Sequence, residues 1–76
     1  MTQPIKWTRR GIAWRSADHL YSVGETYSGD GVRYRAALHA SVFNVRPLGE
    51  IRDTAEAAMA DAQAEADRIA ALQVPA

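Results

Sequence analysis

The chain has 76 residues, no cysteine and a formal net charge of zero, and 47% of its residues are hydrophobic. This length predicts one domain with a marginal core, and the lack of cysteine excludes disulfide staples and thiolate metal sites. Small domains without staples often associate, so a homodimer is expected. No apolar run reaches the roughly 18 residues that span a membrane. A cytoplasmic protein is expected, because no apolar signal segment follows the polar start.

Charge is distributed unevenly along the chain. Residues 1–52 hold eight Lys/Arg and four Asp/Glu, a net charge of +4, whereas residues 53–76 hold one Arg and five Asp/Glu, a net charge of −4. The sequence leaves two interpretations open. Either the two parts neutralise each other, or their separation creates a local field that a partner recognises.

The first part of the chain has the period-two pattern of β-strands. Residues 5–46 are predicted to hold about three antiparallel strands, at 12–15, 20–27 and 32–40, after a loose N-terminus at 1–4. The Asp-Gly step between the second and third strands favours a tight hairpin, because glycine adopts positive φ angles.

Alternation in the third predicted strand separates an apolar face from a basic one. The apolar face has Val32, Tyr34, Ala36 and Leu38, and the basic face has Arg33, Arg35, Ala37 and His39. The bulk of the core is expected to come from Trp7, Trp14, Tyr21, Tyr34, Leu38 and Phe43. Residues 41–52 are ambiguous: they extend the third strand or form a short extra one, and Pro47 argues against a central strand. Leu48-Gly49 is expected to be a connector whose leucine lies under the helix.

Residues 53–72 are predicted to form one amphipathic helix that packs on the sheet, before a loose C-terminus at 73–76. The segment from 54 to 72 is rich in alanine and has neither Gly nor Pro. Asp53 is expected to cap the helix, with Glu56 completing an Asp variant of the capping box. Its apolar stripe consists of Ala55, Ala58, Met59, Ala62, Ala66 and Ile69. Residues 1–76 are therefore expected to form a single α+β domain.

Catalytic, cofactor and metal sites are not predicted. The histidines are His19 and His39, which lack metal-ligand spacing, and no nucleophile elbow surrounds any serine. The glycine-rich turn at 28–31 lacks the lysine and the following helix of a phosphate loop. The helix carboxylates are expected to form a solvated face. The chain is therefore expected not to be an enzyme.

The arginines suggest nucleic-acid binding. Arg15, Arg33 and Arg35 can meet phosphates from one sheet face, together with Arg46 and an arm of Lys6, Arg9 and Arg10. Three-stranded sheets followed by a helix bind DNA in some integrase arm-binding and plant transcription-factor domains. Against this, the pI of about 6.7 is below the basic values expected of such modules. The alternative is a solvated sheet face.

The order of features resembles small phage and prophage accessory proteins. These have two early tryptophans, Tyr-x-Val/Ile and Tyr-x-Ala strands, a Leu-Gly connector and an alanine-rich closing helix. The corresponding segments are Trp7, Trp14, Tyr21-Ser22-Val23, Tyr34-Arg35-Ala36, Leu48-Gly49 and residues 53–58. Such mobile-element proteins include anti-CRISPR proteins, which bind RNA-guided surveillance complexes and block target DNA or nuclease recruitment.

The resemblance implies the leading hypothesis, a non-catalytic phage-type inhibitor that acts by protein contact in the host bacterial cytoplasm. Its implied partner is a CRISPR surveillance complex of type I, whose positively charged channels suit an acidic helix. The expected contact residues are Asp61, Glu65, Asp67, Arg33 and Arg35. The alternative is a small DNA-binding accessory domain of a mobile element that uses the basic sheet face. A third hypothesis is an assembly subunit that works as a homodimer.

Overall fold

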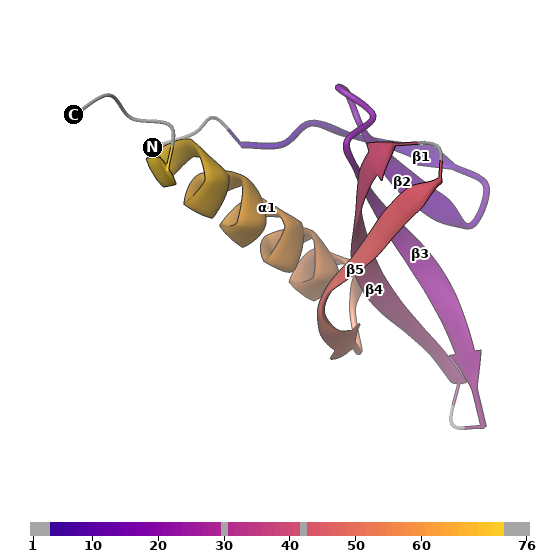
Figure 1. The fold of residues 1–76 in the computed structure, drawn as a ribbon. Coiled ribbons are helices and arrows are strands. Elements are labelled where there is room, and N and C mark those ends of the chain that lie inside the picture. The colour runs from indigo at the N-terminus through magenta and orange to yellow at the C-terminus, as the bar shows by residue number, and fades with distance from the viewer. Residues whose placement is uncertain (1–3, 30, 42, 73–76) are drawn as a thin grey trace.

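The computed structural model describes residues 4–29, 31–41 and 43–72, so the ends predicted to be loose at 1–3 and 73–76 lie outside the described residues. Five antiparallel strands form one meander in the order β1-β2-β3-β4-β5, followed by a helix. The elements are β1 Trp7–Arg10, β2 Ala13–Ser16, β3 Tyr21–Ser28, β4 Gly31–Ser41, β5 Asn44–Arg52 and α1 Ala55–Leu72. Figure 1 shows the helix packed on one face of the sheet.

The α+β class is confirmed, but the sheet has five strands where about three were predicted. Residues 7–10, which come before the first predicted strand, form β1 and pair with β2, and most of the ambiguous stretch becomes β5. Pro47 is tolerated there because β5 is an edge strand and one side of its backbone needs no ladder partner. The β4–β5 register shifts between Tyr34 and Ala36, where Gly49 adopts a φ of 67°.

The core lies between the first half of α1 and the sheet, and small side chains close it. The buried cluster consists of Tyr21, Val23, Ala36, Leu48, Ala55, Ala58 and Ala62. Alanine on both layers brings the helix close to the sheet, while large partly buried side chains surround the contact. These surrounding residues are Ile5, Trp7, Trp14, Tyr34, Leu38, Met59 and Ala66. The position of Leu48 in the core and the predicted stripe from Ala55 to Ala66 are thereby confirmed, whereas Ile69 is not part of this cluster.

One predicted core residue was wrong. Phe43 is 97% exposed, because it occupies the turn between β4 and β5 rather than a strand position facing the helix. Leu48 instead supplies the buried side chain of this region.

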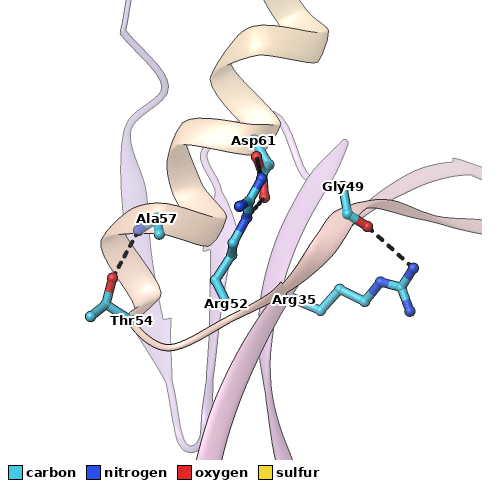
Figure 2. A network of polar contacts seen from close by, with 6 residues as sticks. All are labelled: Arg35, Gly49, Arg52, Thr54, Ala57 and Asp61. Carbon is cyan, nitrogen blue, oxygen red and sulfur yellow. Dashed lines mark hydrogen bonds and ion pairs between the residues drawn. The ribbon is translucent and has the colours of Figure 1, made fainter.

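The helix begins at Ala55, and the predicted cap at Asp53 was also wrong. The Ala57 N–H donates to Thr54 Oγ1 at 3.2 Å, so the Thr54 side chain satisfies an N–H that has no partner within the helix (Figure 2). Asp53 lies outside the helix, with its carboxylate 3.7 Å from the Arg33 guanidinium.

Ion pairs connect the helix to the edge strand β5. Arg52 donates from Nε and Nη2 to the two carboxylate oxygens of Asp61, at 2.8 and 2.9 Å (Figure 2). Arg46 donates to Glu65 at 3.3 Å, and Arg68 contacts the same carboxylate. The Asp61 and Glu65 side chains are only 18% and 13% exposed. The prediction of a solvated acidic face was therefore wrong for these two residues, because strand arginines cover them.

Gly49 lies directly beneath the Asp61 carboxylate. Its φ of 67° is in the left-handed region, and a Cβ added there would lie 2.6 Å from Asp61 Oδ2. Gly11 has nearly the same backbone conformation, with a φ of 62°, but nothing lies within 4 Å of an added Cβ. A comparison of alanine substitutions at the two glycines therefore separates the cost of backbone strain from the cost of steric overlap.

We predict that Gly49→Ala destabilises the domain more than Gly11→Ala does. Both substitutions place alanine in a left-handed conformation, which costs about 1–2 kcal/mol. Gly49→Ala also displaces the Asp61 carboxylate from Arg52, and overpacking of this kind adds about 1–3 kcal/mol. Urea unfolding of the two variants measures the difference. Equal losses would show that Asp61 moves aside without consequence.

Ser16 fixes the connection between β2 and β3. Its side chain is buried, accepts the Tyr21 N–H at 2.9 Å and donates to Asp18 Oδ1 at 2.6 Å. The same Asp18 oxygen accepts the Leu20 N–H at 3.1 Å. The hydrogen bond from Ser16, followed by that from the Leu20 amide, lowers the pKa of Asp18 below its ordinary value.

We predict that Ser16→Ala costs about 1–3 kcal/mol, because the buried Tyr21 N–H loses its acceptor. The pKa of Asp18 should rise, since its strongest hydrogen bond is removed. A lowered folded pKa contributes stability that is present above the ordinary value of 3.8 and is lost as pH falls through the folded value. On acidification, the free energy of unfolding should therefore fall less in the Ser16→Ala variant than in the unmodified protein.

Urea unfolding as a function of pH and carboxyl NMR of Asp18 provide the measurements. Ser41→Ala is the matched control, because Ser41 is an exposed strand serine. A control variant that loses as much stability as Ser16→Ala would contradict the role assigned to the buried hydroxyl.

Candidate functional site

The face of the sheet opposite the helix carries small and basic side chains, and we call it the open face. Strand register places Arg15 beside Ser22, and Gly24 between Ala13 and Arg35. Because alternate residues of a strand share a face, the pairings define the whole surface. The open face consists of Thr8, Arg10, Ala13, Arg15, Ser22, Gly24, Thr26, Arg33, Arg35, Ala37, His39, Val45 and Pro47.

The arginines of the open face lie on either side of β3. Arg10 and Arg15 are on β1 and β2, and Arg33 and Arg35 are on β4. Neighbouring strands are about 4.8 Å apart, so the backbones of β2 and β4 are separated by about 10 Å. The strip of β3 between them presents only Ser22, Gly24 and Thr26.

These arginines differ from those on the helix side in their ion pairs. In the described part of the chain, Arg10, Arg15 and Arg35 form no salt bridge. Arg33 has one at 3.7 Å to Asp53, but the two side chains are 43% and 86% exposed, and such pairs contribute little. The open face is therefore positively charged although the net charge of the chain is zero.

The backbone orients one of these guanidinium groups. Arg35 donates to the Gly49 carbonyl at 3.2 Å. Figure 2 shows Arg35 extending away from the helix, whereas Arg52 extends toward Asp61. Gly49 of β5 therefore accepts a hydrogen bond from Arg35 of the open face and lies close to Asp61 of the helix.

One end of the open face is hollowed into a cleft of about 370 Å³. The cleft is lined by Arg10, Ala13, Trp14, Arg15, His19, Ser22 and His39. Ser22 Oγ and His39 Nε2 are 2.7 Å apart, and Arg15 donates from Nε and Nη2 to the His19 carbonyl at 3.3 and 3.0 Å. Burial, and next the positive charge of Arg15, lower the pKa of His39.

A serine beside an imidazole is part of the arrangement used in nucleophilic catalysis. That chemistry also uses a group that orients the imidazole through its other nitrogen. Among the described residues, no hydrogen bond reaches His39 Nδ1. What the cleft offers is a set of cationic and hydroxyl donors, which is the chemistry of anion binding.

The predicted contact residues do not share one surface. Arg33 and Arg35 lie on the open face. Asp61 and Glu65 lie on the helix and are paired with strand arginines. Asp67 is exposed and accepts a hydrogen bond from the Gln63 amide at 3.1 Å.

The basic surface predicted from the arginines is confirmed only in part. Arg10 joins Arg15, Arg33 and Arg35 on the open face. Arg46 instead binds Glu65 on the helix. The Arg9 guanidinium lies 5.1 Å from the centroid of the Trp14 ring. Sequence reasoning missed the bond between Ser22 and His39, because they are 17 residues apart and meet only through the β3–β4 register.

The described residues contain no cluster of three or more His, Asp or Glu side chains that could hold a metal ion. Within the same ranges, α1 is too polar to serve as a transmembrane segment. No protein-family model, curated protein or solved structure matches the chain.

Proposed function

We propose that this domain is a small DNA-binding module that holds a DNA duplex against its open face. The observation that carries the proposal is the separation of its arginines into two groups. Those facing the helix, Arg46 and Arg52, are neutralised by helix carboxylates. Those on the open face have only one weak ion pair among the described residues. Unpaired arginines on one surface are suited to a phosphate backbone.

The chemistry of the open face favours a duplex over a single strand. Proteins that bind single strands stack the bases on aromatic side chains. Here Trp7, Trp14, Tyr21 and Tyr34 pack in or against the core. Tyr27 is 67% exposed, but strand alternation places it on the face that α1 covers. Arginines and small side chains therefore make up most of the open face, and among the described residues Trp14 is the aromatic side chain that lines its cleft.

The dimensions of the open face also fit a duplex. The major groove is about 12 Å wide and admits β-strands. The arginines on either side of β3 are spaced to reach phosphates on both edges of such a groove. The small side chains of β3 allow its backbone to approach the base edges between them. The helix carboxylates lie in the other layer of the fold, where their repulsion of the DNA is reduced.

We predict that the purified protein binds a duplex at low salt and that its affinity falls steeply as salt increases. Contacts to about three phosphates give a slope near −3 in a plot of log K against log salt concentration. Arg35→Gln should weaken binding and reduce the slope by about one, because one phosphate contact is lost. Fluorescence anisotropy with a labelled duplex measures both quantities.

Arg46→Gln is the matched control, since it removes the same charge from the helix side of the same sheet. Affinity that falls equally in both variants would show that only total charge matters, and would contradict an interface on the open face. A duplex that fails to bind at low salt would overturn the proposal itself.

The inhibitor hypothesis and the homodimer stay predictions. Two of the expected acidic contacts, Asp61 and Glu65, are occupied within the fold, which weakens the argument for an acidic helix that enters a basic channel. Target binding by a purified type I surveillance complex, with and without this protein, tests the inhibitor hypothesis. Loss of target binding by the complex, with no binding of free duplex by the protein, would favour inhibition over DNA binding.

A further inference from the structure

We propose that the cleft at the end of the open face is a phosphate-binding subsite formed by Arg10, Arg15, Ser22 and His39. This inference rests on the proposed function for its ligand class, a phosphate of the DNA backbone. It adds a defined place where one phosphate is held by several donors at once. The four residues come from β1, β2, β3 and β4, so the subsite depends on the folded sheet.

Strand register brings these side chains together. Arg15 lies directly across from Ser22 on the neighbouring strand. The hydroxyl of Ser22 is 2.7 Å from His39 Nε2, which spans the next strand pair. Arg10 enters the same cleft from β1. Three side chains with nitrogen donors and one hydroxyl thus border one concave volume.

Arg15 is held in place before any ligand arrives. The turn between β2 and β3 contains His19 with a φ of 63°, and its carbonyl accepts both Nε and Nη2 of Arg15. A guanidinium has five N–H groups, so donors remain for a second partner. Because the side chain is already ordered, less conformational entropy is lost when it binds an anion.

The titratable side chains that line the cleft are arginines and histidines. Arg15 faces His39 from β2, Ser22 faces it from β3, and the β2–β3 turn and β1 contribute His19 and Arg10. The residue paired with His39 on β5 is the apolar Val45. Among the residues that the structure describes, no carboxylate lines this cleft. A bound phosphate would offset the repulsion between Arg15 and a protonated His39.

Phosphate fits this donor set better than a carboxylate does. Its tetrahedral oxygens can accept from guanidinium, imidazole and hydroxyl donors that approach from different directions. The cleft of about 370 Å³ is open to the sheet surface, so a phosphate in a continuous backbone can enter it. Binding and protonation are then linked: phosphate raises the pKa of His39, and lower pH strengthens phosphate binding.

NMR titration of the His39 imidazole in the full chain tests the subsite, with inorganic phosphate as the probe and sodium chloride at matched ionic strength as reference. The pKa of His39 starts below its ordinary value of 6.5. We expect phosphate to raise it in a saturable manner, while chloride does not. An identical pKa of His39 in phosphate and chloride would overturn the subsite, and this comparison needs only the unmodified protein.

Substitution of two neighbouring arginines tests whether phosphate binding is localised to the cleft. Arg10→Gln should weaken phosphate binding by about tenfold, the effect of losing one charge-assisted hydrogen bond. Arg9→Gln should leave it unchanged, because Arg9 lies on the other side of the strand against Trp14. Equal weakening in both variants would contradict a localised subsite.

Different experimental results would contradict the subsite and the proposed function. Duplex binding without a phosphate-dependent pKa of His39 would remove the subsite and keep the DNA interface. A phosphate-dependent pKa without duplex binding would establish the subsite and overturn the DNA-binding proposal.

Discussion

In the described part of the chain a single helix forms the second layer, and it can cover only one face of the sheet. The covered face must then supply the entire core, which explains why Trp7, Trp14, Tyr21 and Tyr34 pack in or against it. The uncovered face has no such requirement. Most of its positions hold glycine, alanine, serine, threonine and arginine, residues that tolerate contact with water, and the others hold His39, Val45 and Pro47.

The coverage of only one sheet face by the helix also determines how the charges are distributed. Close packing of Ala58 and Ala62 on the sheet brings helix carboxylates within reach of arginines on the edge strand. Positive and negative charges therefore cancel on the covered side, although the chain separates them in sequence. Among the described residues, the arginines of the other face then keep only the exposed pair between Arg33 and Asp53. A chain with no net charge thus has a strongly basic surface, which its isoelectric point conceals.

Local patterns predicted the helix and the three central strands well, because strand alternation and an alanine-rich segment are properties of neighbouring residues. They missed β1 and left β5 ambiguous. They failed where position along the chain does not determine distance in space. Phe43 and Leu48 are both apolar residues near a proline, and only the β4–β5 register decides that Leu48 meets the helix. Thr54 and Asp53 are both good caps in sequence, and only the fold shows that the Thr54 side chain accepts the Ala57 N–H.

For the candidate site, alternation placed Arg33, Arg35 and His39 on one face, and the structure confirms that grouping. The partners of each charge were beyond sequence reasoning. The pairing of Asp61 with Arg52 bridges a strand and a helix, and that of Ser22 with His39 bridges two strands. Such pairs depend on the fold as a whole.

The order of the strands also determines which two strands form the edges of the sheet. β1 has four residues, and β5 has a proline, a left-handed glycine and two register shifts. Short or irregular borders are poor templates for the addition of a foreign strand. A domain with one bare sheet face would otherwise be prone to grow into fibrils by lateral pairing. Here the irregular borders disfavour that route, so the flat surface can stay accessible without promoting aggregation.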